Sequence, residues 1–231
     1  MKRKIYISAV LLFTLVLSCR KHEVVPAPVE SLELETNFTG LINGTDVEYS
    51  EDVDGYNGSS EFDQYITSIG ADTMVYYAKM SSDLKTPYIR IGVGSIEWDA
   101  STLATPSITQ FEDFFLGLNP DDNGVPVLLN YSLKAKNGFE VTYYDNAGLT
   151  WVSTLEHDGN VLQNPPTPIE NPTFSNVTIE KDTDGSHYTF FTVNFGCELY
   201  RFKAYINNDP LLPDYDTIRI ENGVFKGWIK R

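Results

Sequence analysis

Apolar and polar residues alternate along most of the chain beyond residue 30. Short alternating runs rich in Thr, Tyr, Val, Ile and Phe, broken by Gly, Asn and Asp, are typical of half-buried β-strands. The clearest runs predict strands at residues 73–80, 87–98, 127–135, 139–144 and 188–195. Because no helices alternate with these runs, the pattern predicts an all-β fold, an antiparallel β-sandwich of jelly-roll-like or Ig-like type.

Several dipeptides between the alternating runs are those that accept a positive φ angle in tight hairpins. Asn43-Gly44 and Asn222-Gly223 are two examples. We therefore expect a turn at each of these positions.

One segment, residues 107–118, departs from the period of two. Its sequence, SITQFEDFFLGL, has apolar residues at helical spacing, and Ser107 with Gln110 fits the capping-box pattern. This segment predicts a single short helix, packed over one end of the sandwich with its phenylalanines in the core. An apolar lid over a ligand pocket is the alternative interpretation.

The N-terminus has the pattern of a secretory signal. Three basic residues precede an apolar run at residues 5–17, which is too short to cross a bilayer core. The run ends at Leu17, Ser18 and Cys19, which resembles the lipobox of bacterial lipoproteins. The resemblance implies that the chain is cut before Cys19, that the thiol carries diacylglycerol, and that the new amino group is acylated, typically with palmitate.

This interpretation divides the chain into three parts. Residues 1–18 are a signal peptide, residues 19–31 are the lipidated cysteine and a tether, and residues 32–231 are a single β-sandwich domain. Four prolines within residues 163–172 mark a seam that an inter-sheet loop explains as well as a domain linker. Arg20 stands where an aspartate would favour inner-membrane retention, so the resemblance implies an outer-membrane anchor, with the periplasmic or surface side left open.

Cys19 and Cys197 are the two cysteines of the chain. A disulfide between them is one interpretation, since exported proteins often pair their cysteines. Lipidation of Cys19 excludes that pairing and leaves Cys197 as a lone thiol. Because the residues around it are apolar and β-prone, we expect Cys197 to be a buried core residue.

The chain is acidic, with a formal net charge of −15. Loss of the signal peptide removes Lys2, Arg3 and Lys4, which makes the charge −15 − 3 = −18. Nucleic acid is excluded as a partner, because it requires a cationic face. Divalent cations, cationic partners and neutral glycans remain open, and solubility is the simpler explanation of the charge.

The run EDVDGYNGSSEFD at residues 51–63 has the oxygen-rich composition of a calcium loop. The candidate ligands are Asp52, Asp54, Asn57 and Asp63. Their spacing is displaced by one residue from the EF-hand pattern, and helices do not flank it. We therefore favour an acidic hairpin tip and keep a calcium site in a β-sandwich loop as the alternative.

The aromatic residues, 13% of the chain, suggest a second function. Exposed aromatic rings on a sheet can stack on sugar rings. The candidates are Trp98, Trp151 and Tyr144, together with Tyr76, Tyr77 and Tyr143. Because consecutive residues of a strand point to opposite faces, we expect at least half of these rings to lie in the core.

Catalytic patterns are sparse. Glu97 and Asp99 share one face of a predicted strand and are the nearest approach to a carboxylate pair. A solvated strand face is the more frequent role of such a pair, so we assign no catalytic residue.

Several short motifs along the chain resemble those of uncharacterised lipoproteins from Bacteroidota-type bacteria. They are residues 38–44, 148–151, 195–200 and 222–227. The resemblance implies a β-sandwich lipoprotein of the outer membrane and supplies no catalytic residue. The leading hypothesis is a non-enzymatic, lipid-anchored envelope protein that acts as a binding or accessory module of unspecified ligand, with a glycan or an envelope protein as the candidate partners. A carbohydrate-binding sandwich, with or without calcium, is the second hypothesis, and a glycoside hydrolase is the third.

Overall fold

A computed structural model describes residues 32–65, 72–132, 137–154, 156–157, 160–161, 169–206 and 213–231. Leu32–Arg231 forms one compact unit. Cys19 and residues 20–31 lie outside the described residues. The described elements are β1 Asn37–Ile42, β2 Thr45–Ser50, β3 Tyr56–Tyr65, β4 Asp72–Ser82, β5 Tyr88–Trp98, α2 Ile108–Leu116, β6 Gly138–Tyr144, β7 Thr150–Val152, β8 Glu156–His157, β9 Asn160–Val161, β10 Glu170–Lys181, β11 His187–Tyr205 and β12 Pro213–Lys230.

Ten of the strands form one antiparallel sheet in the order β2-β1-β12-β11-β7-β6-β5-β4-β3, and β10 pairs with the first half of β11. β8 and β9 form a separate two-stranded ladder. β3 to β7 follow one another as an antiparallel meander, whereas β1 and β12 pair across almost the whole domain sequence.

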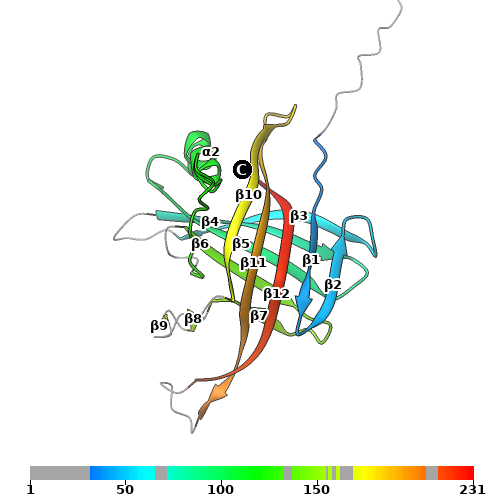
Figure 1. Ribbon diagram of the computed structural model, residues 1–231. Coiled ribbons are helices and arrows are strands. Elements are labelled where there is room, and N and C mark those ends of the chain that lie inside the picture. Colours follow the sequence, from blue (N-terminus) through cyan, green and yellow to red (C-terminus); the bar gives the residue numbers. More distant parts are fainter. Residues whose placement is uncertain are drawn as a thin grey trace, which may run out of the picture. The chain divides into compact units, whose positions relative to one another are not determined.

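The large sheet curls so that its parts face each other. β10, β11, β12 and β1 run across β3 to β6 in a second layer (Figure 1). The end of β12 reaches β3, where the backbone N–H of Lys230 donates to Ser60 Oγ at 3.0 Å. The predicted all-β, sandwich-like fold with one short helix is confirmed.

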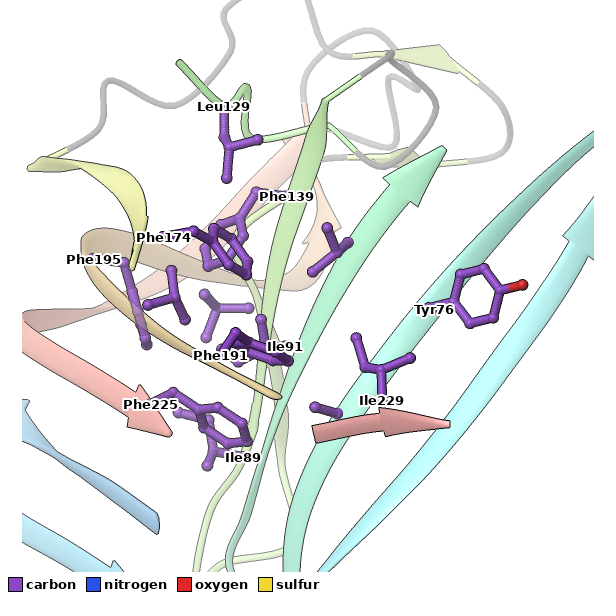
Figure 2. Close-up of a cluster of buried hydrophobic side chains, with 14 of the residues drawn as sticks. Tyr76, Ile89, Ile91, Leu129, Phe139, Phe174, Phe191, Phe195, Phe225 and Ile229 are labelled. Atoms are coloured by element: carbon purple, nitrogen blue, oxygen red, sulfur yellow. The ribbon is translucent and has the colours of Figure 1, made fainter. Parts of the chain in front are cut away.

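The core lies between these layers and is rich in aromatic rings. Side chains of alternate residues point inward, as the period of two predicts. Ile89 and Ile91 of β5 are fully buried, and they face Phe191, Phe195 and other residues from the opposite layer (Figure 2).

Helix α2 covers one end of this core. Ser107 and Gln110 form the predicted capping box, and Phe111 and Phe115 are fully buried. Both rings contact Tyr76 edge to face, with centroids 5.2 and 5.8 Å away. The helix therefore packs its phenylalanines as core residues. In the described part of the chain, no helix has the length and apolar character needed to cross a bilayer.

Two local predictions are wrong. The described part of residues 127–135 forms no strand, because its backbone pairing is limited to an isolated bridge between Asn130 and Gly138. Asn222-Gly223 does not end a strand but lies inside β12, where β12 has one residue more than its partners β1 and β11 and forms a bulge. Asn222 does adopt a positive φ of 51°, so the dipeptide accommodates an irregular strand rather than a hairpin.

The last part of β11 and the first part of β12 form a two-stranded arm. Beyond the pairing of Tyr200 with Val152 of β7, residues 201–205 of β11 pair only with β12 among the described strands. One side of the arm has contacts among aromatic rings, including Phe202 with Tyr215 at 6.0 Å. The other side carries ion pairs among Arg201, Lys203, Asp214 and Asp216.

Candidate functional site

The outer side of β3 to β6 carries a cluster of polar and charged side chains that we call the polar face. Its members come from four neighbouring strands, and in β4, β5 and β6 their sequence neighbours point into the core. The polar face consists of Glu61, Tyr77, Lys79, Arg90, Glu140 and Thr142.

Several of these side chains are buried to an unusual degree. The outer side of an antiparallel sandwich is normally solvated, yet Tyr77, Glu140 and Thr142 are only 3%, 8% and 2% exposed. Val75, beside Tyr77 on the same side of β4, is 1% exposed. Burial of a carboxylate costs free energy unless the carboxylate has partners. A buried polar cluster on the outer side of a sheet therefore marks this side as a candidate functional site.

The strand register places Tyr77 and Glu140 of the polar face on either side of Gly92. Tyr77 pairs with Gly92, and Gly92 pairs with Glu140, so the middle position of this row has no side chain. The guanidinium of Arg90 lies over the Tyr77 ring, with Cζ 4.3 Å from the centroid. This distance is within the range of a cation–π interaction.

Arg90 also lies between two carboxylates. Its Nη1 is 3.8 Å from Glu61 Oε2, and its Nη2 is 3.9 Å from Glu140 Oε1. Lys79 Nζ approaches the other oxygen of Glu61 at 3.5 Å. The arrangement is a chain of alternating charges, in which Glu61 lies between Lys79 and Arg90, and Arg90 lies between Glu61 and Glu140.

Hydroxyl groups fix Glu140 in place. The Thr154 hydroxyl donates to Oε2, and the Thr142 hydroxyl lies 3.4 Å from Oε1. Thr142 Oγ1 also lies 3.4 Å from Nη2 of Arg90, which makes it a bridge between the two charges. Arg90 Nε is buried without a hydrogen-bond acceptor among the described residues.

The phenol of Tyr77 is held in its protonated form. Burial raises the pKa of Tyr77, and the nearby Tyr65, Glu140 and Asp63 raise it further, against the opposing charge of Arg90. A protonated phenol is a hydrogen-bond donor at neutral pH. The polar face therefore combines donors and acceptors within a small area.

Two further tyrosines lie one row along the same strands. Tyr88 and Tyr144 are paired in register, and their rings stack at 5.1 Å with an interplanar angle of 11°. Lys79 Nζ lies 4.8 Å from the Tyr88 centroid, which connects this pair to the polar face. Of the sequence-predicted aromatic candidates, Tyr144 is thus on an accessible side of the sheet.

Apart from Tyr77 of the polar face, the other aromatic candidates belong to the core. Trp98 and Trp151 are 6% and 7% exposed, and Tyr76 and Tyr143 are also buried. The Trp98 indole donates to the carbonyl of Leu103, and the Trp151 indole donates to Asp145. The structure thus corrects their assignment as stacking platforms, because a sugar cannot reach a buried ring face.

The structure does not bring the four calcium candidates together. Asp52 and Asp54 occupy the turn between β2 and β3, both with positive φ, and Asn57 lies at the start of β3. Asp63 is six residues further along that strand, a distance of about 20 Å at the usual rise. Within the described residues, no group of three or more His, Cys, Asp or Glu side chains could hold a metal ion. The turn is not a hairpin tip either, because β2 and β3 are not paired with each other: among the described strands β2 pairs with β1 and β3 pairs with β4, at opposite ends of the strand order.

Other candidate reactive groups have structural roles. Cys197 is a buried free thiol, as predicted, and burial raises its pKa to about 12. Glu97 and Asp99 do not face each other across a cleft: Asp99 accepts hydrogen bonds from the backbone and hydroxyl of Ser101 in a turn. His187 Nδ1 lies 2.7 Å from a carboxylate oxygen of Glu112 and so joins β11 to α2.

Sequence reasoning missed Glu61, Lys79, Arg90, Glu140 and Thr142. A usable signal was present, because four of the five lie in predicted strands at positions that alternate with buried residues. Alternation shows that such residues point away from the core, but it does not show which strands are neighbours.

No family model, no curated protein and no solved structure matches this chain. The polar face and the N-terminal sequence pattern are thus the two features from which function can be argued.

Proposed function

We propose that this chain is a lipid-anchored protein of the bacterial outer membrane that binds a ligand on the polar face and catalyses no reaction. The observation that carries the binding role is the burial of a charged and hydrogen-bonding cluster on the outer side of a sheet. Such clusters are costly to maintain, and side chains with perturbed environments are concentrated at functional sites.

The membrane attachment rests on the sequence. The basic and apolar residues before Leu17, Ser18 and Cys19 resemble a lipoprotein signal, and several acyl chains on one residue give stable anchoring. The compact unit begins at Leu32, which leaves residues 20–31 to connect it to the anchor.

Binding is favoured over hydrolysis by the way the carboxylates are paired. A glycoside hydrolase needs one carboxyl group as an acid and another as a nucleophile or base on opposite sides of the bond to be cleaved. Glu61 and Glu140 instead engage opposite ends of the same guanidinium. This geometry favours a fixed recognition surface.

The anchoring half of the proposal is tested by fractionation. Full-length protein and its Cys19→Ala variant would be produced in a Gram-negative host with labelled palmitate. We expect the label and the outer-membrane location for the wild type alone. Label in the variant, or processed variant that still sediments with membranes, would contradict lipidation at Cys19.

The binding half is tested by co-sedimentation of a Leu32–Arg231 protein with isolated Gram-negative envelopes. We expect Arg90→Met to lower the bound fraction at least threefold, because it removes the centre of the polar face. Arg219→Met is the matched control, since Arg219 forms an exposed pair with Glu198 elsewhere. Equal sedimentation of all three proteins would exclude the polar face as the binding surface.

A further inference from the structure

The charged contacts of the polar face are close but too long for direct hydrogen bonds. The three contacts of Glu61 and Arg90 measure 3.5 to 3.9 Å, whereas direct N–H···O bonds are 2.7 to 3.2 Å. The side chains of Glu61, Lys79 and Arg90 are 45%, 25% and 27% exposed, so a ligand can reach them. Each of these charges has a partner of opposite charge, but part of their hydrogen-bonding capacity is unused.

A hydroxyl group matches this spacing. Its oxygen can lie about 2.8 Å from both members of a pair that is 3.8 Å apart, and a polar contact of this length is commonly bridged by such an oxygen. The hydroxyl would accept from the guanidinium of Arg90 and donate to the carboxylate of Glu61. Neighbouring hydroxyls of one ligand could use the Lys79 contact in the same way.

The charge of the surroundings favours a neutral ligand. Glu61, Asp63 and Glu140 outnumber Lys79 and Arg90 on this side of the sheet, and the whole chain has a net charge of −15. A polyanion would be repelled. A strongly cationic ligand would have to displace two cations that already contact the carboxylates.

We infer that the polar face binds a neutral carbohydrate, whose hydroxyls insert among Glu61, Lys79 and Arg90. This inference rests on the proposed binding function and names its ligand class. The Tyr88–Tyr144 pair lies beside Lys79 and offers an apolar edge to the C–H groups of a sugar ring. An open-chain polyol would contact only the charged groups, whereas a sugar ring would contact both the charged groups and the tyrosine pair.

Affinity electrophoresis of the Leu32–Arg231 protein tests this inference. The probes are a neutral glucan, mannan and xylan, with a polyuronate as the charged comparison. We expect at least one neutral polysaccharide to retard the wild type, and Arg90→Met and Glu61→Gln each to weaken that affinity at least tenfold. Arg219→Met and Glu35→Gln are the matched controls, and both should bind as the wild type does.

Thermal unfolding separates lost binding from lost folding, and Glu61→Gln, at a half-exposed side chain, keeps the test valid if Arg90→Met unfolds. Retardation by the polyuronate alone, or equal retardation of all variants, would overturn the inference. If envelope co-sedimentation depends on Arg90 but no neutral polysaccharide retards the protein, the inferred ligand class is wrong, whereas the proposed binding function is supported. If neither assay shows dependence on Arg90, both proposals fail.

Discussion

At the residue scale, Gly58 shows how one missing side chain holds the start of the domain. A Cβ atom at this position would lie 2.1 Å from Thr36 Oγ1 and 2.8 Å from Thr36 Cβ. Thr36 is almost fully buried, and its N–H donates to Glu51. Two residues earlier, the carbonyl of Leu34 accepts from the Trp228 indole. The absence of a side chain at Gly58 therefore lets the first described residues pack against β3 and β12.

We predict that Gly58→Ala lowers the free energy of unfolding by about 1–3 kcal/mol, the usual cost of overpacking. Urea unfolding of the Leu32–Arg231 protein measures this change. The clash is the proposed cause, so the same substitution should cost less in a Thr36→Gly background. An equal cost in both backgrounds would show that Thr36 is not the cause.

The sequence identifies residues with special backbone angles better than it identifies their role. Asn43, Asp52, Asp54 and Asn222 all adopt positive φ, as their residue types allow. The first three lie in turns. Asn222 lies within β12, because β1 and β11 pair with β12 both before and after this residue. The long-range partner, which local sequence does not specify, decides between a turn and a bulge.

At the element scale, α2 was predictable because its signals are local. The capping box and the spacing of Phe111 and Phe115 depend on neighbours within one or two turns. Residues 127–135 show the opposite case, since alternation there indicated a strand but the described part has almost no backbone partner. A strand needs a neighbour that the chain must bring from elsewhere.

We predict that Phe111→Ala destabilises the domain by about 3–5 kcal/mol, because it empties a fully buried site between α2 and Tyr76. Ile108→Ala is the control in the same helix, where the side chain is 40% exposed. It should cost less than about 1.5 kcal/mol. Urea unfolding followed by circular dichroism compares the two, and similar costs would mean that α2 does not pack as described.

At the scale of the whole molecule, the all-β class followed from alternation, whereas the candidate site did not. Arg90 and Glu140 meet across β5 and β6, although α2 and a long connection separate these strands in sequence. Their meeting depends on the order and register of the strands. Those properties arise from the packing of the entire core, which a periodic pattern in one segment does not determine.

The two ends of β12 have different surroundings. Trp228 lies near the start of the domain, where Leu34 and Thr36 pack. Tyr215 lies in the arm, thirteen residues earlier, which corresponds to about 43 Å along a strand. Where β12 is flanked by β1 and β11, its backbone is paired on both sides, but the arm is a ribbon of two strands.

We predict that amides of the arm exchange with deuterium at least about a hundredfold faster than amides in the flanked parts of β11 and β12. Isolated two-stranded ribbons are marginally stable in water, and local opening is easiest where few buried contacts are lost. Hydrogen-exchange mass spectrometry compares peptides within 200–206 and 213–217 with peptides within 188–195 and 220–226, where β11 and β12 are paired on both sides. Equal protection would mean that the aromatic contacts of Phe202 and Tyr215, together with the Arg201–Asp216 ion pair, are strong enough to make the arm open only with the core.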